Sequence, residues 1–199
     1  MTPDDILPTY ESVAADFAAS RDKTLFERKW LDRMLACTPP PRRVLDLGCG
    51  SGNPIARYLT DRRARVTGVD GAAAMIALFR QTLPQARALH ADMRKLNLGE
   101  AFDAILAWNS FFHLSPDDQR AMFARFAAHS AQNTVLMFTA GPSAGEPIGQ
   151  VAGQPVYHSS LDPQEYRQLL AEHDFDLLHF APEDPNCNGH TIWMARFAG

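Results

Sequence analysis

The chain has 199 residues, of which 46% are hydrophobic and 21% charged, and its formal net charge is -4. This length suits one domain with a sizeable core, and the composition is that of a globular protein rather than a disordered chain. Lys and Arg are scattered and form no basic stripe, which argues against a nucleic-acid partner. The chain also lacks an apolar run typical of a signal peptide or a membrane span, so we expect a cytoplasmic protein that does not act at a membrane. The three cysteines are widely spaced, which predicts neither a disulfide framework nor a metal site.

The spacing of apolar residues predicts two helices at the start of the chain and then an alternation of strands and helices. The first two helices are expected at 8–20 and 22–36, where the sequence TPPPRR ends the second. Asn53 is expected to cap the next helix, with Pro54 as its first residue. The alternation predicts an α/β fold with a mostly parallel sheet covered by helices on both faces. The expected strands are 43–48, 65–70, 86–92, 101–109, 133–140, 176–183 and 190–197, and the later helices are 53–63, 71–83, 115–129 and 161–175.

The stretch VLDLGCGSGNP places glycines at 48, 50 and 52 immediately after the first predicted strand. Glycines there let the backbone turn sharply and approach a ligand closely. Asp70 ends the next strand, where a carboxylate can accept hydrogen bonds from the hydroxyls of a ribose. Together these features predict a bound adenosine. The spacing G-x-G-x-G differs from the dinucleotide fingerprint, which disfavours a nicotinamide-dependent oxidoreductase as the alternative.

Four segments, VLDLGCGSG, VTGVD, LHADM and FDAILAWNSFFHL, resemble in order and spacing the successive motifs of class I methyltransferases that use S-adenosylmethionine. Other segments, among them YHSSLDPQEYR, resemble a group of small bacterial methyltransferases of unassigned substrate. The resemblance implies a Rossmann-like, doubly wound sheet of seven strands in the order 3-2-1-4-5-7-6, with strand 7 antiparallel. It further implies S-adenosylmethionine as cofactor and the following cofactor-binding residues: Asp46, Gly48, Cys49, Gly50, Asp70, Gly71, Met75, Asp92, Met93, Ala107, Trp108 and Asn109.

Within that resemblance, Asp46, Gly48 and Gly50 would surround the methionine part of the cofactor, and Asp70 would bind its ribose. Asp92 and Met93 would flank the adenine, and the backbone of 107–109 would lie beside the sulfonium. We expect a single domain that has a helical cap at 1–40 and a cofactor-binding core at 41–140. Residues 141–199 would then supply a roof loop, the last helix and a C-terminal hairpin.

The methyl acceptor has to be inferred from the remaining residues at the same sheet edge. His113 is the candidate general base, and Phe112, Tyr157 and His158 are candidate pocket residues. We expect the His113 loop and the connections 140–160 and 183–189 to converge over the methyl-donating sulfur, with Tyr10, Phe17 and Arg21 as further cover. A small, mostly apolar pocket there would select a small-molecule acceptor. Methylation of a protein or nucleic acid stays open as an alternative, as does the oligomeric state.

Overall fold

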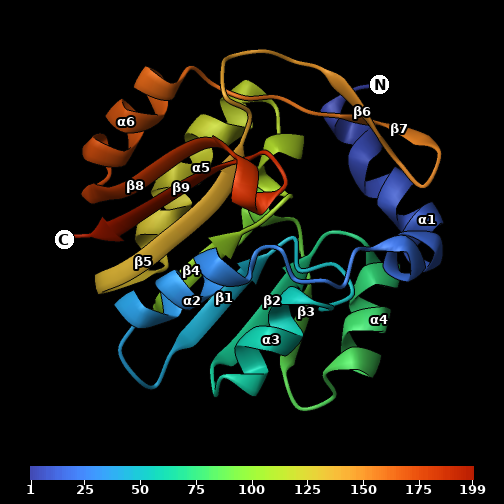
Figure 1. The fold of residues 1–199 in the computed structure, drawn as a ribbon, viewed down its shortest axis with the longest axis horizontal. Helices are drawn as coiled ribbons and strands as arrows, with labels where there is room; N and C mark the ends of the chain where they lie inside the picture. Colours follow the sequence, from blue (N-terminus) through green and yellow to red (C-terminus); the bar gives the residue numbers. More distant parts are fainter.

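The computed structural model describes residues 1–199. Its main sheet contains β1 Arg43–Leu47, β2 Arg65–Asp70, β3 Arg87–His90, β4 Phe102–Ala107, β5 Ser130–Ala140, β8 Phe175–Asp184 and β9 His190–Phe197. These strands lie in the order β3-β2-β1-β4-β5-β9-β8 (Figure 1). β1 to β5 are parallel, β9 runs antiparallel to β5, and β8 runs antiparallel to β9. The predicted strand order and the reversed seventh strand are therefore confirmed.

Helices cover both faces of this sheet, as Figure 1 shows. The covering helices are α2 Arg28–Cys37, α3 Ile55–Asp61, α4 Ala73–Thr82, α5 Pro116–Ala128 and α6 Pro163–Glu172, and a further helix, α1 Ile6–Ser20, precedes them in the chain. α2, α3 and α4 pack on one face, and α5 and α6 pack on the other. None of the helices combines the length and the hydropathy that crossing a bilayer would require.

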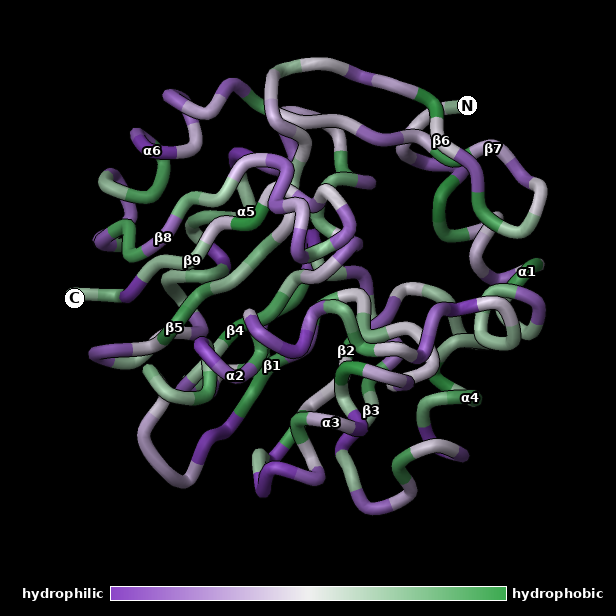
Figure 2. The backbone as a smooth tube through the Cα atoms, viewed as in Figure 1, coloured by the Kyte–Doolittle hydropathy of each residue, from purple (hydrophilic) through white to green (hydrophobic).

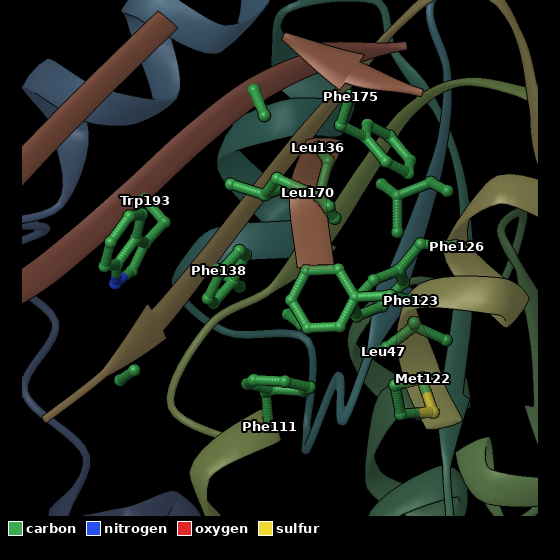
Figure 3. Packing of buried hydrophobic residues seen from close by; sticks show 14 of the residues in the cluster. Leu47, Phe111, Met122, Phe123, Phe126, Leu136, Phe138, Leu170, Phe175 and Trp193 are labelled. Atoms are coloured by element: carbon green, nitrogen blue, oxygen red, sulfur yellow. The ribbon is translucent and has the colours of Figure 1, made fainter. Parts of the chain in front are cut away.

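The central strands are hydrophobic along most of their length because both of their faces are covered (Figure 2). On the α5 and α6 side, Phe111, Phe123 and Phe138 are fully buried and pack edge-to-face with one another (Figure 3). Trp193 of β9 stacks on Phe138 with ring centroids 6.0 Å apart. This aromatic cluster fixes the start of the loop that carries His113, because Phe111 lies in the same short 3-10 turn.

The starts of α2 and α3 differ from the prediction for identifiable reasons. α2 begins at Arg28 rather than at residue 22, because the side chain of Asp22 accepts a hydrogen bond from the Thr24 N–H and holds a turn there. α3 begins at Ile55 with Pro54 as the N-cap residue, and no side chain caps this helix. The Arg57 N–H instead bonds to the Gly52 carbonyl at 2.9 Å, which closes the first turn without Asn53.

The connection between β5 and α6, expected to be a plain loop, contains a hairpin of two short strands, β6 Ile148–Val151 and β7 Gln154–Tyr157. Ala152 and Gly153 turn the chain with φ values of +46° and +77°, as a type I′ hairpin requires. The hairpin lies beside the N-terminal part of α1 in Figure 1, and Ile6 packs against Val156 and Tyr157.

α1 stands outside the two helical layers and crosses the carboxyl edge of the sheet. It packs on α4 and on β7. A Cβ atom added at Gly71 would lie 2.5 Å from the Leu7 side chain, so glycine permits this close approach. The Ala74 N–H donates to Glu11 Oε2 at 2.9 Å, which ties α1 to the start of α4.

Candidate functional site

A pocket with an empty volume of about 1090 Å³, partly open to solvent, lies where β1, β2 and β4 end beneath α1. This is the edge where open α/β sheets bind ligands. Most of the predicted site residues line it, namely Asp46, Gly48, Cys49, Gly50, Asp70, Gly71, Met75, Asp92, Met93, Trp108, Asn109 and His113. Ala107, Phe112, Tyr157 and His158 are not among the lining residues.

The glycine turn after β1 forms the floor of the pocket. Gly48, Gly50 and Gly52 have φ values of +72°, +52° and +78°, in the left-handed region that favours glycine. The N–H groups of Gly48 and Cys49 both donate to the Val69 carbonyl, at 2.8 and 3.0 Å, which binds the turn to β2. A Cβ at Gly48 would lie 2.2 Å from the Ser110 Cβ, so packing as well as φ requires glycine there.

Asp70 at the end of β2 is fixed by two backbone hydrogen bonds. Its Oδ2 accepts from the Gly50 N–H and its Oδ1 from the Ala72 N–H, both at 2.9 Å. Burial raises the pKa of Asp70, although these two hydrogen bonds oppose the effect. Each carboxylate oxygen keeps a further lone pair for a ligand. A ligand with hydroxyl groups could therefore bind to a carboxylate that is already oriented.

Asp46 is the least compensated charge in the pocket. Its side chain is buried, with 4% relative exposure, and no donor of the protein hydrogen-bonds to it. Burial, and to a smaller extent the neighbouring charge of Asp70, raises the pKa of Asp46 to about 7. A buried carboxylate without partners is unfavourable unless a ligand supplies a donor. The position therefore fits a ligand that brings an ammonium group.

Asp92 lines the pocket, but both of its oxygens face Arg94. The Arg94 N–H donates to Oδ1 at 2.9 Å, and its guanidinium lies 2.7 Å from Oδ2. Burial alone would raise the pKa of Asp92, but the hydrogen bonds from Arg94 lower it below its ordinary value. Asp92 therefore holds the Arg94 side chain in place beside the pocket. Arg94 also approaches Asp4 and Asp118, both at 3.5 Å.

His113 lies in the pocket wall with both ring nitrogens bonded. Nδ1 is 2.8 Å from the Tyr157 carbonyl, which can only accept, so Nδ1 carries the hydrogen. Nε2 then accepts from the hydroxyl of Tyr10 at 2.9 Å. Burial lowers the pKa of His113 to about 4. The structure therefore provides no general base at this position that titrates near neutrality.

Phe112, Tyr157 and His158 lie behind His113 instead of lining the pocket. The His113 ring is 4.9 Å from the rings of Phe112 and His158. Tyr157 bonds to Glu146 through its hydroxyl and orients His113 through its carbonyl. None of the three lines this pocket: Tyr157 packs against Ile6 of α1, and the rings of Phe112 and His158 pack on each other at 4.7 Å.

The cover of the pocket is α1, together with Arg21 at its end. Tyr10, Phe17 and Arg21 line the pocket as expected, and Leu7 joins them. Neither 140–160 nor 183–189 contributes a lining residue. The former folds into the hairpin, and the latter buries Cys187 in the core beside α2, so of the three loops expected to form the roof only the loop that carries His113 lines the pocket.

Comparison with known proteins identifies relatives of the chain. A family model described as "Methyltransferase domain" matches residues 44–133. The dTDP-3-amino-3,6-dideoxy-alpha-D-glucopyranose N,N-dimethyltransferase of Streptomyces fradiae is 31% identical over 159 residues, which cover 71% of this chain and 62% of that protein. The trans-aconitate 2-methyltransferase of Escherichia coli O6:K15:H31 (strain 536 / UPEC) is 38% identical over 111 residues, 53% of this chain and 40% of that protein. The chain spans less than two thirds of the length of these curated relatives.

Solved structures agree with the fold. CalS10, described as an amino pentose methyltransferase from Micromonospora echinaspora and solved with bound S-adenosylmethionine, has a TM-score of 0.72 at 22% identity, with 94% of this chain and 96% of that chain covered. The 1,6-didemethyltoxoflavin-N1-methyltransferase of Burkholderia thailandensis, solved with that substrate and S-adenosylhomocysteine, has a TM-score of 0.72 at 20% identity, with 99% and 87% covered. At these sequence identities the two structures support only the fold of the chain.

Proposed function

We propose that the chain is a class I S-adenosylmethionine-dependent methyltransferase and that it methylates a small molecule. The observation that carries the proposal is the unpartnered, buried carboxylate of Asp46 beside the glycine turn. S-adenosylmethionine has a cationic amino group, a ribose and an adenine, which require an acid, a second hydrogen-bond acceptor and an apolar cleft. Asp46, Asp70 and the side chains of Met75 and Met93 supply these in one pocket.

When bound there, S-adenosylmethionine would supply a methyl group on a sulfonium, whose leaving group is a neutral thioether. The transfer needs little proton chemistry, and correct positioning can provide up to about 7–11 kcal/mol of the barrier reduction. The residues of the chain therefore have to hold donor and acceptor in line and exclude water. α1 covers the pocket and so supports both tasks.

On the acceptor side, we assign the positioning role to the Tyr10–His113 pair. The Tyr10 hydrogen is committed to His113 Nε2, so the Tyr10 oxygen offers only lone pairs to the pocket. An acceptor with an N–H or O–H group could donate to this oxygen and direct its own lone pair toward the methyl group. His113 would act through Tyr10 and would not itself remove a proton.

Charge supports an amine rather than a carboxylate as the acceptor. Both arginines of the pocket, Arg21 and Arg94, are already paired with carboxylates, so no unpaired cation there would bind an anionic acceptor. The name of the Streptomyces fradiae relative, an N,N-dimethyltransferase acting on an amino sugar, agrees with this assignment.

The test is methyl transfer from isotopically labelled S-adenosylmethionine to small amines, alcohols and carboxylates of matched size, followed by mass spectrometry. We expect amines to be methylated by the wild type and much less by Tyr10→Phe. Methylation of carboxylates alone, at a rate unchanged by Tyr10→Phe, would refute the acceptor assignment.

A further inference from the structure

Three hydrogen bonds join Tyr157 and Ser159 to the short turn that carries His113. The Ser159 N–H donates to the Phe112 carbonyl at 2.7 Å, and the Ser159 hydroxyl donates to the Leu114 carbonyl at 2.6 Å. The third is the bond from His113 Nδ1 to the Tyr157 carbonyl at 2.8 Å. The backbone on both sides of His113 and the ring itself are therefore held by one short segment that follows β7.

Ser159 is in turn held by Gln119 of α5, and both residues are fully buried. Gln119 Nε2 donates to the Ser159 hydroxyl oxygen at 2.7 Å and lies 3.0 and 3.1 Å from the carbonyls of Ser159 and Leu114. Tyr166 of α6 determines which way round this amide lies. Its oxygen accepts from the Leu161 N–H at 3.0 Å, so its own hydrogen goes to Gln119 Oε1 at 2.6 Å. None of the buried polar atoms of these side chains lacks a partner.

This chain of hydrogen bonds leads from α6 to the pocket. It runs from Tyr166 through Gln119 and Ser159 to the turn of His113, and His113 Nε2 then accepts from the Tyr10 hydroxyl at 2.9 Å. Tyr10 and His113 line the pocket, whereas the other three residues do not. Replacing buried polar groups by apolar side chains of similar volume often costs no stability, so stability alone does not account for a polar network in this part of the core.

We propose that Ser159, Gln119 and Tyr166 are positioning residues of the acceptor site, which hold His113 so that the Tyr10 oxygen faces the methyl acceptor. The inference rests on the proposed function, because it assigns what holds the Tyr10–His113 pair. The ring nitrogen of a neutral histidine that carries the hydrogen is set by the bond made at the other nitrogen. Keeping the Tyr157 carbonyl opposite Nδ1 therefore leaves Nε2 free to accept from Tyr10. The role also accounts for two residues of the segment YHSSLDPQEYR, Ser159 and Tyr166.

The first measurement is the tautomer of His113, which does not require a known acceptor. Nitrogen NMR of protein with isotopically labelled histidine rings should show His113 as the neutral Nδ1–H tautomer near neutral pH, assigned by the loss of its signal in His113→Asn. Gln119→Met keeps the length of the side chain but removes the amide, and it should move part of the His113 population to the Nε2–H tautomer. Ser159→Ala, a smaller change in case Gln119→Met does not fold, should act in the same direction. The matched control is Thr38→Val, which removes a buried hydroxyl that donates to the Met34 carbonyl at 2.8 Å, and it should leave the tautomer unchanged.

The second measurement is a double-mutant cycle with Tyr10. With the amine that the wild type methylates best, Ser159→Ala should lower kcat/KM roughly tenfold, because a small misplacement of a reacting group is costly. The affinity for S-adenosylhomocysteine should change less than about twofold. In a Tyr10→Phe background Ser159→Ala should lower kcat/KM less than about twofold, since the residue through which Ser159 acts has lost its hydroxyl.

Equal losses from Ser159→Ala in the two backgrounds would overturn the inference. A His113 tautomer unchanged in both Gln119→Met and Ser159→Ala would overturn it as well. An unaltered rate in Tyr10→Phe alone would instead overturn the proposed role of Tyr10 in binding the acceptor.

Discussion

The backbone N–H of Gly50 donates to Oδ2 of Asp70 at 2.9 Å, so the carboxylate that ends β2 also holds the turn that follows β1. One side chain therefore supports the shape of the pocket and also lines it. Changes at Asp70 should for this reason affect stability as well as binding.

Asp70→Ala should weaken S-adenosylhomocysteine on the order of ten- to a hundred-fold, because charge-assisted hydrogen bonds of about 1.5–3 kcal/mol are lost. It should also lower the melting temperature, since the N–H groups of Gly50 and Ala72 lose their acceptor. Calorimetry and thermal unfolding measure the two effects, with the exposed Asp61→Ala as control. Unchanged affinity would place the ribose elsewhere.

S-adenosylhomocysteine should stabilise the fold, whereas NAD and NADP should not. At about 100 times the dissociation constant, linkage predicts about 2.7 kcal/mol of added stability. For a chain of this size that corresponds to a shift of roughly 5–10 °C, at about 2–4 °C per kcal/mol. A thermal-shift series with all three ligands measures it. A flat melting temperature at millimolar S-adenosylhomocysteine would contradict the cofactor assignment.

Asp46 should make the free protein less stable as the pH rises. Its folded-state pKa of about 7 lies above the ordinary value of 3.8, so the folded state binds the proton more tightly than the unfolded state between these values. The free energy of unfolding should therefore fall as the pH rises through that window. His113, with its folded-state pKa lowered to about 4, acts in the opposite direction between about pH 4 and 6.5.

The comparison with Asp46→Asn separates the two effects, because only the contribution of Asp46 is removed. Relative to wild type, this variant should gain stability at pH 8 and lose that advantage at pH 5. Binding of S-adenosylhomocysteine near pH 6.5 should also release a proton from wild type and not from Asp46→Asn. Calorimetry in buffers of different ionisation enthalpy detects that release. Identical proton release in both proteins would argue against an ammonium group at Asp46.

Tyr10→Phe and His113→Asn should both lower turnover while leaving the affinity for S-adenosylhomocysteine within about threefold. In Tyr10→Phe the methyl acceptor loses the hydroxyl oxygen to which it would bind. In His113→Asn the Tyr10 hydroxyl loses its hydrogen-bond partner. Because burial lowers the pKa of His113 to about 4, the pH profile of kcat between 6 and 8 should keep its shape in His113→Asn. A lost inflection in that range would restore His113 as a general base.

Gly48→Ala should destabilise the chain more than Gly99→Ala. Both residues have positive φ, +72° and +65°, which alone costs an alanine about 1–2 kcal/mol. A Cβ at Gly99 meets nothing within 4 Å, whereas at Gly48 it would overlap Ser110. Overpacking should add about 1–3 kcal/mol. Denaturant unfolding of the two variants measures the difference, and equal losses would show that φ alone requires the glycine.

The sequence predicted the sheet well because local patterns determine it. Strands β1, β2 and β4 are apolar runs that end in turn residues, and their order follows from the family resemblance. The turn of Gly48 and the position of Asp70 were likewise visible as motifs. These features depend on neighbours in the chain, which a sequence displays directly.

The acceptor side could not be predicted in the same way. The hairpin strands β6 and β7 have four residues each and are interrupted by glycine and proline, and their packing against Ile6 is a long-range contact. Tyr10 meets His113 from the far end of the chain. Tyr10 and Phe17 were expected to cover the pocket, but no local pattern in the sequence indicated that Tyr10 would bond to His113.

The sheet order has a consequence for synthesis. β9 follows β8 in sequence but lies between β5 and β8, so β8 leaves the ribosome before the strand to which it pairs. β5 meanwhile presents an open edge on which Phe138 and its aromatic neighbours lack the cover of Trp193. The two strands beyond β5 therefore join the sheet in one late step. A chain arrested before His190 would expose two unpaired strands and become a substrate for chaperones or proteases.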